Sequence, residues 1–145
     1  MKEENKQAFP KDIVCIGEER MAAEILIVDD HQEFLNFMER ALIMLGWSVI
    51  TASNARDALD KLHYIKPNLI LLDMRMPEID GFELTRMLKN NSAYHDIPIL
   101  AVTGLDTPEN RKLCLEAGCD DFISKPFRVP ELHNRMRRLL CKDQP

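Results

Sequence analysis

The chain has 145 residues, a length that suits a single domain able to fold around its own apolar core. Acidic residues outnumber basic ones by 24 to 19, and the resulting net charge of −5 argues against a free-standing nucleic-acid binder. The four cysteines form no CxxC pair, and the sequence shows neither a signal peptide nor an 18-residue apolar run. We therefore expect a cytoplasmic protein with reduced thiols and no membrane insertion.

Residues 1–22 are polar and lack a clear period, so we expect a leader or a linker there. A regular alternation of patterns begins at Ala23 and continues to Cys141. It predicts one domain over 23–141, followed by a short tail at 142–145. Both a single-domain protein and a domain of a longer protein fit this organisation, and we favour the single-domain protein.

The first half of this domain alternates between short apolar runs and stretches with helical spacing. In chain order these predict a strand at 24–30, a helix from Phe34 to Leu45, a strand at 47–52, a helix at 55–62 and a strand at 68–73. Gly46 is expected to end the first helix, and Asn54 to cap the second.

The second half continues the same alternation. It predicts a helix at 81–91, a strand at 97–104, a helix from Pro108 to Gly118, a strand at 120–124 and a last helix from near Pro130. Thr107 and Pro108 form an expected N-cap and first-turn pair. Alternating strands and helices predict right-handed crossovers and a parallel sheet. The fold class is therefore α/β, a flavodoxin-like doubly wound (βα)5 fold with strand order 2-1-3-4-5.

Polar residues follow several of these strands where ligands bind in open α/β sheets, at the carboxyl edge. Asp29 and Asp30 end the first strand, Asp73 ends the third, Thr103 ends the fourth, and Lys125 follows the fifth. Three converging carboxylates repel one another unless a cation is present. Oxygen ligands suit a hard cation, and Mg²⁺ is the usual one where phosphate is handled. The strand ends therefore predict a site for a hard divalent cation.

Four sequence motifs occur in a fixed order and spacing: ILIVDD, LILLDMRMPEIDG, AVTG and GCDDFISKPF. Over about residues 23–141 the chain closely resembles the receiver domains of response regulators in two-component signalling, including the chemotaxis receivers. The resemblance implies that Asp73 is the phosphoacceptor. It also implies that Asp29, Asp30, Asp73 and the backbone carbonyl of Arg75 bind Mg²⁺.

The resemblance extends to the residues around the phosphoryl group. It implies that the Thr103 hydroxyl and the Lys125 ammonium bind the phosphoryl oxygens, and that Phe122 is the aromatic switch residue. It also implies a cis peptide bond between Lys125 and Pro126. Gly104 is small enough to leave the site open to a partner's histidine. Arg75 and Leu105 occupy variable positions that are expected to tune the lifetime of the phosphorylated state. Arg75 is able to pair with Glu78 or to reach toward the phosphate, and Leu105 to screen the site from attacking water.

A domain of this kind implies two classes of partner. A histidine kinase or a histidine phosphotransfer protein supplies the phosphoryl group, and a downstream protein target or an output domain responds to it. The responding face is expected around the helix from Pro108, the strand at 120–124 and the last helix. The domain itself is not expected to be an enzyme beyond its own phosphotransfer and dephosphorylation, or to bind nucleic acid directly.

Two other functions fit parts of the pattern. A binding module that is never phosphorylated would share the fold, although no essential residue of the site is missing here. A magnesium-dependent phosphohydrolase with an aspartyl nucleophile would need a second aspartate at position 75, where the chain has arginine. The histidines at 31, 63, 95 and 133 match no metal-ligand spacing and are interpreted as surface or capping residues. The arginines at 135, 137 and 138 are interpreted as a solvated helix face.

Overall fold

A computed structural model describes residues 23–141 of the chain. The predicted leader or linker at 1–22 and the tail at 142–145 lie outside the described residues. Within the described range, no helix is both long and apolar enough to cross a membrane.

Five parallel strands form one sheet in the order β2-β1-β3-β4-β5, as predicted. The strands are β1 (Glu24–Val28), β2 (Ser48–Ala52), β3 (Leu69–Asp73), β4 (Ile99–Thr103) and β5 (Asp121–Ser124). Every residue of β3 and β4 is buried, because both strands lie inside the sheet and are covered on both faces.

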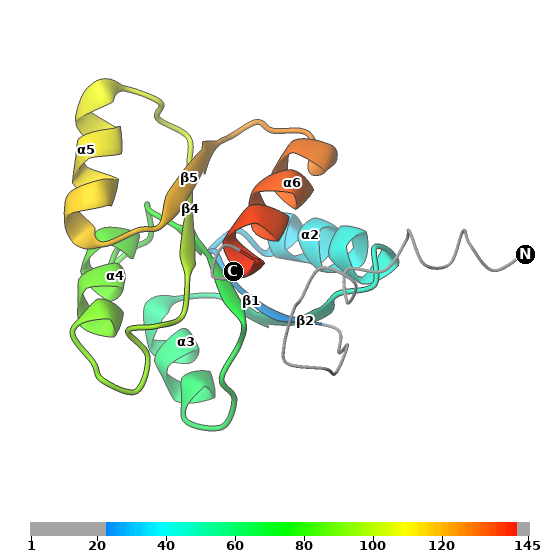
Figure 1. The fold of residues 1–145 in the computed structure, drawn as a ribbon, viewed down its shortest axis with the longest axis horizontal. Coiled ribbons are helices and arrows are strands. Elements are labelled where there is room, and N and C mark those ends of the chain that lie inside the picture. The colour runs from blue at the N-terminus through cyan, green and yellow to red at the C-terminus, as the bar shows by residue number, and fades with distance from the viewer. Residues whose placement is uncertain (1–22, 142–145) are drawn as a thin grey trace, which may run out of the picture.

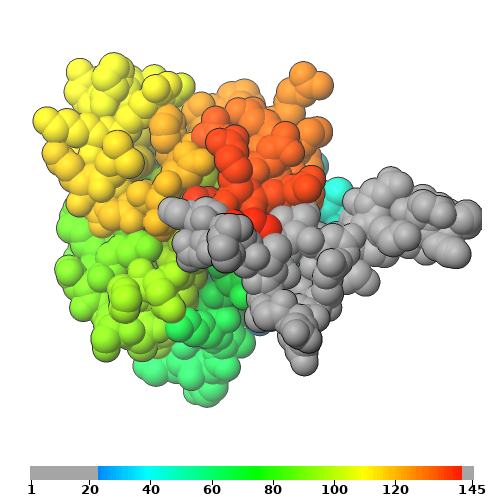
Figure 2. Space-filling view, viewed as in Figure 1, coloured from blue at the N-terminus to red at the C-terminus, as the bar shows by residue number. Residues whose placement is uncertain are grey.

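Five helices connect the strands and cover the sheet (Figure 1). They are α2 (Gln32–Met44), α3 (Ala55–Leu62), α4 (Gly81–Lys89), α5 (Pro108–Ala117) and α6 (Val129–Leu140). One apolar core packs α3, α4 and α5 against one face of the sheet, and a second packs α2 and α6 against the other. In the space-filling view, α5 and α4 adjoin along one side of the molecule (Figure 2). The doubly wound fold is therefore confirmed.

The expected helix caps are present. The Asn54 side chain accepts from the backbone N–H of Asp57 at 2.7 Å, and the Thr107 hydroxyl accepts from that of Asn110 at 3.1 Å. Gly118 ends α5 in the left-handed region, with φ at 111°. These local signals fix where α3 and α5 begin and where α5 turns towards β5.

Several element boundaries differ by a few residues from the prediction. β1 ends at Val28, and the next two residues belong to the loop because the Asp29 carboxylate accepts the N–H of His31 at 2.8 Å. α4 ends at Lys89 rather than at residue 91, since Asn90 is the C-cap. The Asp29 N–H still donates to the Ala52 carbonyl of β2 at 3.1 Å, so the ladder continues to this residue, while the side chains of Asp29 and Asp30 lie at the carboxyl edge.

Candidate functional site

Asp73 ends the buried strand β3, and its side chain is only 5% exposed. One carboxylate oxygen, Oδ1, accepts the backbone N–H of Arg75 at 3.2 Å. The other, Oδ2, is buried without a hydrogen-bond partner among residues 23–141. Burial, reinforced by the negative charge of Asp29, raises the pKa of Asp73 to about 6. A buried oxygen without a partner calls for a bound cation or donor at this position.

Asp29 lies beside Asp73 and pairs with the predicted site residue Lys125. The Lys125 ammonium is 3.0 Å from Asp29 Oδ2, and Asp29 itself is 1% exposed. The same ammonium lies 4.3 Å from the centroid of the Phe34 ring, a cation–π contact that holds it from the α2 side. The peptide bond between Lys125 and Pro126, expected to be cis, is cis in the structure. The chain thus brings a lysine from β5 to the ends of β1 and β3.

A cluster of four residues at this edge has the arrangement of a cation site. Asp29, Asp30, His31 and Asp73 each place one ligand atom within 4.8 Å of the others. The three carboxylates provide the hard oxygen atoms that Mg²⁺ prefers, and one of them, Asp73, has a buried oxygen without a hydrogen-bond partner in the described residues. The residues present therefore fit a divalent cation.

His31 is the member of this cluster that the sequence interpretation missed. It is the N-cap residue of α2, but within the described helix its side chain makes no capping hydrogen bond. Instead its Nδ1 atom lies 3.0 Å from Asp29 Oδ1 and 3.3 Å from Asp30 Oδ1. The two carboxylates raise the pKa of His31, with the Asp29 hydrogen bond as the largest cause. Its position directly after the acidic pair was the available signal, which a search for HExxH spacing does not detect.

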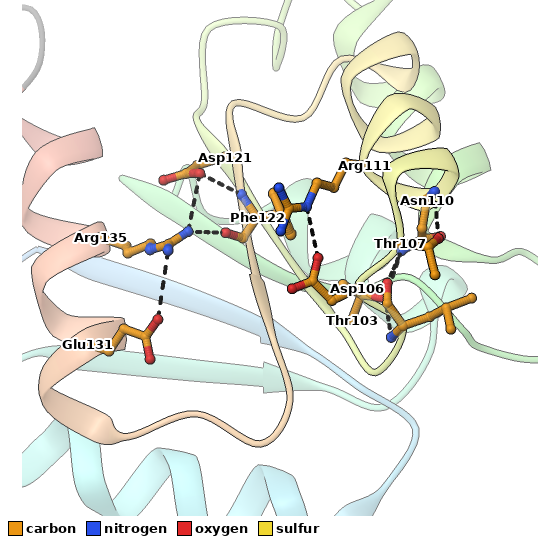
Figure 3. A network of polar contacts seen from close by, with 10 residues as sticks. Thr103, Asp106, Thr107, Asn110, Arg111, Asp121, Phe122, Glu131 and Arg135 are labelled. Atoms are coloured by element: carbon orange, nitrogen blue, oxygen red, sulfur yellow. Dashed lines mark hydrogen bonds and ion pairs between the residues drawn. The ribbon is translucent and has the colours of Figure 1, made fainter.

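Thr103 ends β4, and its hydroxyl is held by α5 (Figure 3). The side-chain amide of Asn110 donates to Thr103 Oγ1 at 3.0 Å and to the Leu105 carbonyl at 2.8 Å. The backbone N–H of Leu105 also donates to Thr103 Oγ1, at 3.1 Å. Asn110 was not among the predicted site residues, although it is a buried amide on the first turn of α5. A displacement of the Thr103 hydroxyl would therefore break its bond to Asn110 on α5.

Phe122 is half-buried on β5 between α5 and α6, and both helices contact it (Figure 3). From α5, the Arg111 guanidinium lies 5.0 Å from the centre of the Phe122 ring. From α6, Arg135 donates to the Phe122 carbonyl and lies 3.5 Å from Asp121 Oδ1. The interpretation of Arg135 as part of a solvated face was wrong, because the side chain reaches back to the sheet edge. Phe122 thus joins the two helices of the expected responding face.

The chain between β3 and α4 closes tightly against the end of β3 at Gly81. The Gly81 N–H donates to the Met74 carbonyl at 3.1 Å. A Cβ atom at Gly81 would overlap the Asp73 carbonyl oxygen and the Met74 Cα. Only glycine permits this approach, so the Pro77–Gly81 turn and Asp73 form one rigid unit.

Arg75 and Leu105 flank the site on opposite loops. Both line an open hollow of about 580 Å³ between the β3–α4 loop and the start of α5. Arg75 is exposed, and within the described residues it makes no ion pair with Glu78. A Cβ atom added to Gly104 would meet nothing within 4 Å, so this part of the edge is open.

Comparison with known proteins places the chain among signalling domains. The family model described as response regulator receiver domain matches residues 25–137. The response regulator MprA of Mycolicibacterium vanbaalenii is 39% identical over 125 residues, which cover 86% of this chain and 53% of that protein. The chain thus spans about half the length of the curated relatives it matches.

Solved structures agree in fold. The chemotaxis protein CheY4 of Vibrio cholerae is similar with a TM-score of 0.78 and 29% identity, over 82% of this chain and 99% of that one. The receiver domain of a sensor histidine kinase from Pseudomonas aeruginosa, which has a magnesium ion coordinated in its active site cleft, is similar with a TM-score of 0.76 and 30% identity. That match covers 83% of this chain and 98% of the other.

Proposed function

The chain belongs to the family of response regulator receiver domains, and from that premise we propose that Asp73 accepts a phosphoryl group with Mg²⁺ bound beside it. The receiver domain occupies residues 23–141, with a leader or linker before it and a short tail after it. The phosphoryl donor is a histidine kinase or a histidine phosphotransfer protein. The phosphorylated receiver domain then controls a downstream protein or output domain. The family consists of signalling domains rather than conventional enzymes.

The observation that carries this proposal is the buried, unpartnered Oδ2 of Asp73. Phosphoryl transfer depends mainly on positioning and on neutralised charge, and this oxygen lies beside a cation cluster and within the field of Lys125. Asp29, Asp30, Asp73 and the backbone carbonyl of Arg75 would hold the metal. Mg²⁺ would neutralise charge on the transferring group and lower the repulsion between Asp73 and an incoming phosphate. Lys125 would pair with a phosphoryl oxygen, leaving Asp29 to the metal.

The phosphoryl group would switch the domain through Thr103 and Phe122. Phosphorylation adds roughly −1.5 to −2 charges and three acceptor oxygens next to Asp73. The Thr103 hydroxyl would exchange its bonds with Asn110 for one to a phosphoryl oxygen. Phe122 would then turn inward, and the contacts of Arg111 and Arg135 with it would change the face formed by α5, β5 and α6. The phosphoryl group acts by favouring one of two existing states.

A histidine-bearing partner would dock beside Lys125. Phe34, Phe37, Pro126 and Phe127 line an open apolar hollow of about 420 Å³ together with Lys125. Phe37 is 56% exposed, although it is a large apolar side chain. A partner covering it would deliver its phosphohistidine to the same sheet edge as Asp73. We expect Phe37→Ala to slow phosphotransfer from the kinase while leaving phosphorylation by acetyl phosphate unchanged.

Arg75 and Leu105 would set the lifetime of the phosphorylated state by screening the open edge from water. This state is expected not to be unusually short-lived. Because both side chains line the hollow beside the site, their joint truncation to alanine is expected to speed dephosphorylation. An unchanged dephosphorylation rate in the double variant would count against this role.

The decisive experiment is phosphorylation of the full chain by acetyl phosphate with Mg²⁺, measured by intact mass and by phosphate-affinity gel. We expect wild type and Asp96→Ala to take up one phosphoryl group and Asp73→Ala to take up none. Asp96 is a matched control because its carboxylate is exposed and pairs only across the surface with Lys66. Label on the Asp73→Ala protein would refute the site. Failure of the wild type to react, where another receiver reacts, would favour the unphosphorylated binding module, and steady turnover of a phosphate ester would favour the phosphohydrolase.

A further inference from the structure

His31 brings a nitrogen atom to the acidic cluster at the ends of β1 and β3. Its Nδ1 atom is 3.0 Å from Asp29 Oδ1 and 3.3 Å from Asp30 Oδ1. Adjacent ligands of an octahedral cation with bonds of about 2.1 Å are about 3.0 Å apart. Both distances from Nδ1 are therefore close to that between neighbouring ligands on one cation.

The local backbone directs His31 towards the cluster. Its N–H donates to Asp29 Oδ1 at 2.8 Å, which fixes the start of the loop after β1. As the N-cap residue it makes no side-chain capping bond to the described part of α2, so the ring is not engaged by the helix. The ring lies against the carboxylates instead.

Asp73 gives a second and independent indication that an ion belongs here. Its Oδ2 is buried and has no partner within residues 23–141, while the Lys125 ammonium is already paired with Asp29. A buried carboxylate oxygen without a partner, on a residue that belongs to this cluster, indicates that a cation or donor binds here.

Building on the metal site of the proposed function, we propose that His31 is itself a ligand of the divalent cation through Nδ1. Imidazole nitrogen suits first-row transition metals such as Co²⁺, Ni²⁺ and Zn²⁺, whereas Mg²⁺ strongly prefers oxygen. The pocket therefore binds these transition-metal ions more tightly than an all-oxygen site would, and His31 accounts for the difference. The site is thus suited to divalent cations of intermediate softness, such as Co²⁺, Ni²⁺ and Zn²⁺, as well as to the hard cation Mg²⁺.

Isothermal titration calorimetry of the full chain with cobalt chloride and with magnesium chloride tests this, with no phosphoryl donor present. His31→Asn keeps a polar group near the position of Nδ1 but removes the imidazole. We expect this variant to lose Co²⁺ affinity by roughly 10- to 100-fold, the range seen when a metal-site residue is lost, while Mg²⁺ affinity changes little. His63→Asn, on an exposed histidine at the end of α3, is the matched control and should change neither.

Proton NMR of the Co²⁺-loaded chain supplies a spectroscopic signature. A ligated imidazole gives a hyperfine-shifted, exchangeable N–H resonance, expected in wild type and in His63→Asn and absent in His31→Asn. Equal losses of Co²⁺ and Mg²⁺ affinity without that resonance in wild type would show that His31 only positions Asp29, and would overturn the proposal. Unchanged Co²⁺ affinity in His31→Asn would overturn it as well.

These readouts need no phosphoryl transfer, so the two proposals fail separately. An Asp73 that resists phosphorylation, with His31-dependent Co²⁺ binding intact, would contradict the proposed function and leave the ligand assignment standing. Phosphorylation with Mg²⁺ but without His31-dependent Co²⁺ binding would overturn only the ligand assignment.

Discussion

Asp73 carries an energetic cost that its neighbours only partly offset. The carboxyl group is almost fully buried, and burial with the adjacent Asp29 charge raises its pKa to about 6. At neutral pH the group is therefore held ionised in surroundings that favour its neutral form. A cation bound at the proposed metal site would relieve this cost.

Asp73→Asn is expected to stabilise the chain in the absence of divalent cations. The substitution removes a buried charge and keeps an acceptor for the Arg75 N–H. A shift of the pKa from its ordinary value to about 6 corresponds to about 2–3 kcal/mol, which we expect as the gain in unfolding free energy at pH 8 in chelator. The sign follows from linkage: with a raised pKa, the stability from the neutral carboxyl is present at acid pH and lost as pH rises through about 6.

Urea denaturation at pH 8 with and without Mg²⁺ measures this gain. Asp96→Asn, on an exposed side chain, should alter the unfolding free energy by no more than about 0.5 kcal/mol. If wild type and Asp73→Asn have equal unfolding free energies at pH 8 in chelator, the buried charge of Asp73 does not destabilise the fold.

At the scale of elements, the junction between β3 and α4 is set by one glycine. Gly81→Ala forces Cβ into the Asp73 carbonyl and the Met74 backbone, atoms that cannot move without shifting β3. We expect a loss of about 3 kcal/mol in unfolding free energy, the upper range for overpacking. Gly104→Ala is the matched control, because its Cβ meets open space and should change stability by less than about 1 kcal/mol. Equal effects of the two substitutions in chemical denaturation would disprove the close approach.

Asn110 connects the start of α5 with the end of β4. Asn110→Ala removes both of its side-chain bonds, to the Thr103 hydroxyl and the Leu105 carbonyl. Because buried polar partners are left unpaired, we expect a loss of about 1–3 kcal/mol in unfolding free energy. Lys112→Ala, on the exposed face of the same helix, should be close to neutral. A neutral Asn110→Ala in thermal or urea unfolding would show that α5 does not depend on Thr103.

The elements themselves were predictable because each has a local cause. Buried apolar runs, helical spacing and caps such as Asn54 and Thr107 depend only on nearby residues, and they give the strands, the helices and the sheet order. Asp73 was identifiable because a carboxylate ending a fully buried strand needs a use. The contacts of Asn110 and Arg135 were not predictable, since each depends on the direction of one side chain towards a residue on another element. His31 was missed although its partners, Asp29 and Asp30, directly precede it in the sequence.

At the scale of the whole molecule, α6 is fastened to the sheet at two places. Arg135 reaches Asp121 and the Phe122 carbonyl in the amino-terminal half of β5, while His133 packs on Trp47 with ring centres 5.6 Å apart. The Trp47 indole N–H donates to His133 Nδ1 at 3.3 Å, an interaction that requires neutral imidazole at that atom. Burial, helped by the positive charge of Arg137, lowers the pKa of His133.

The His133 contact predicts a loss of stability in mild acid. When folding lowers the pKa of a histidine, its neutral imidazole contributes to the unfolding free energy at pH values above its pKa of 6.5 in the unfolded chain. This contribution is lost as the pH falls through the pKa of the folded state. We expect the unfolding free energy, followed by circular dichroism in urea, to fall between pH 7 and pH 5 more in wild type than in His133→Gln. Glutamine keeps an acceptor for Trp47 but does not titrate. Parallel pH profiles for the two proteins would show that the protonation of His133 does not cause the loss of stability in acid.

Trp47 is the only tryptophan of the chain, and it immediately precedes β2, at the edge of the sheet opposite Asp73. Five-residue strands at about 3.3 Å per residue put roughly 16 Å of sheet between those edges. The fluorescence of Trp47 should therefore not respond to ion or phosphate binding whose structural effects are confined to the Asp73 edge of the sheet. A change in Trp47 fluorescence on phosphorylation would mean that the conformational change reaches the opposite edge of the sheet. The fluorescence of this one tryptophan therefore measures how far the change extends.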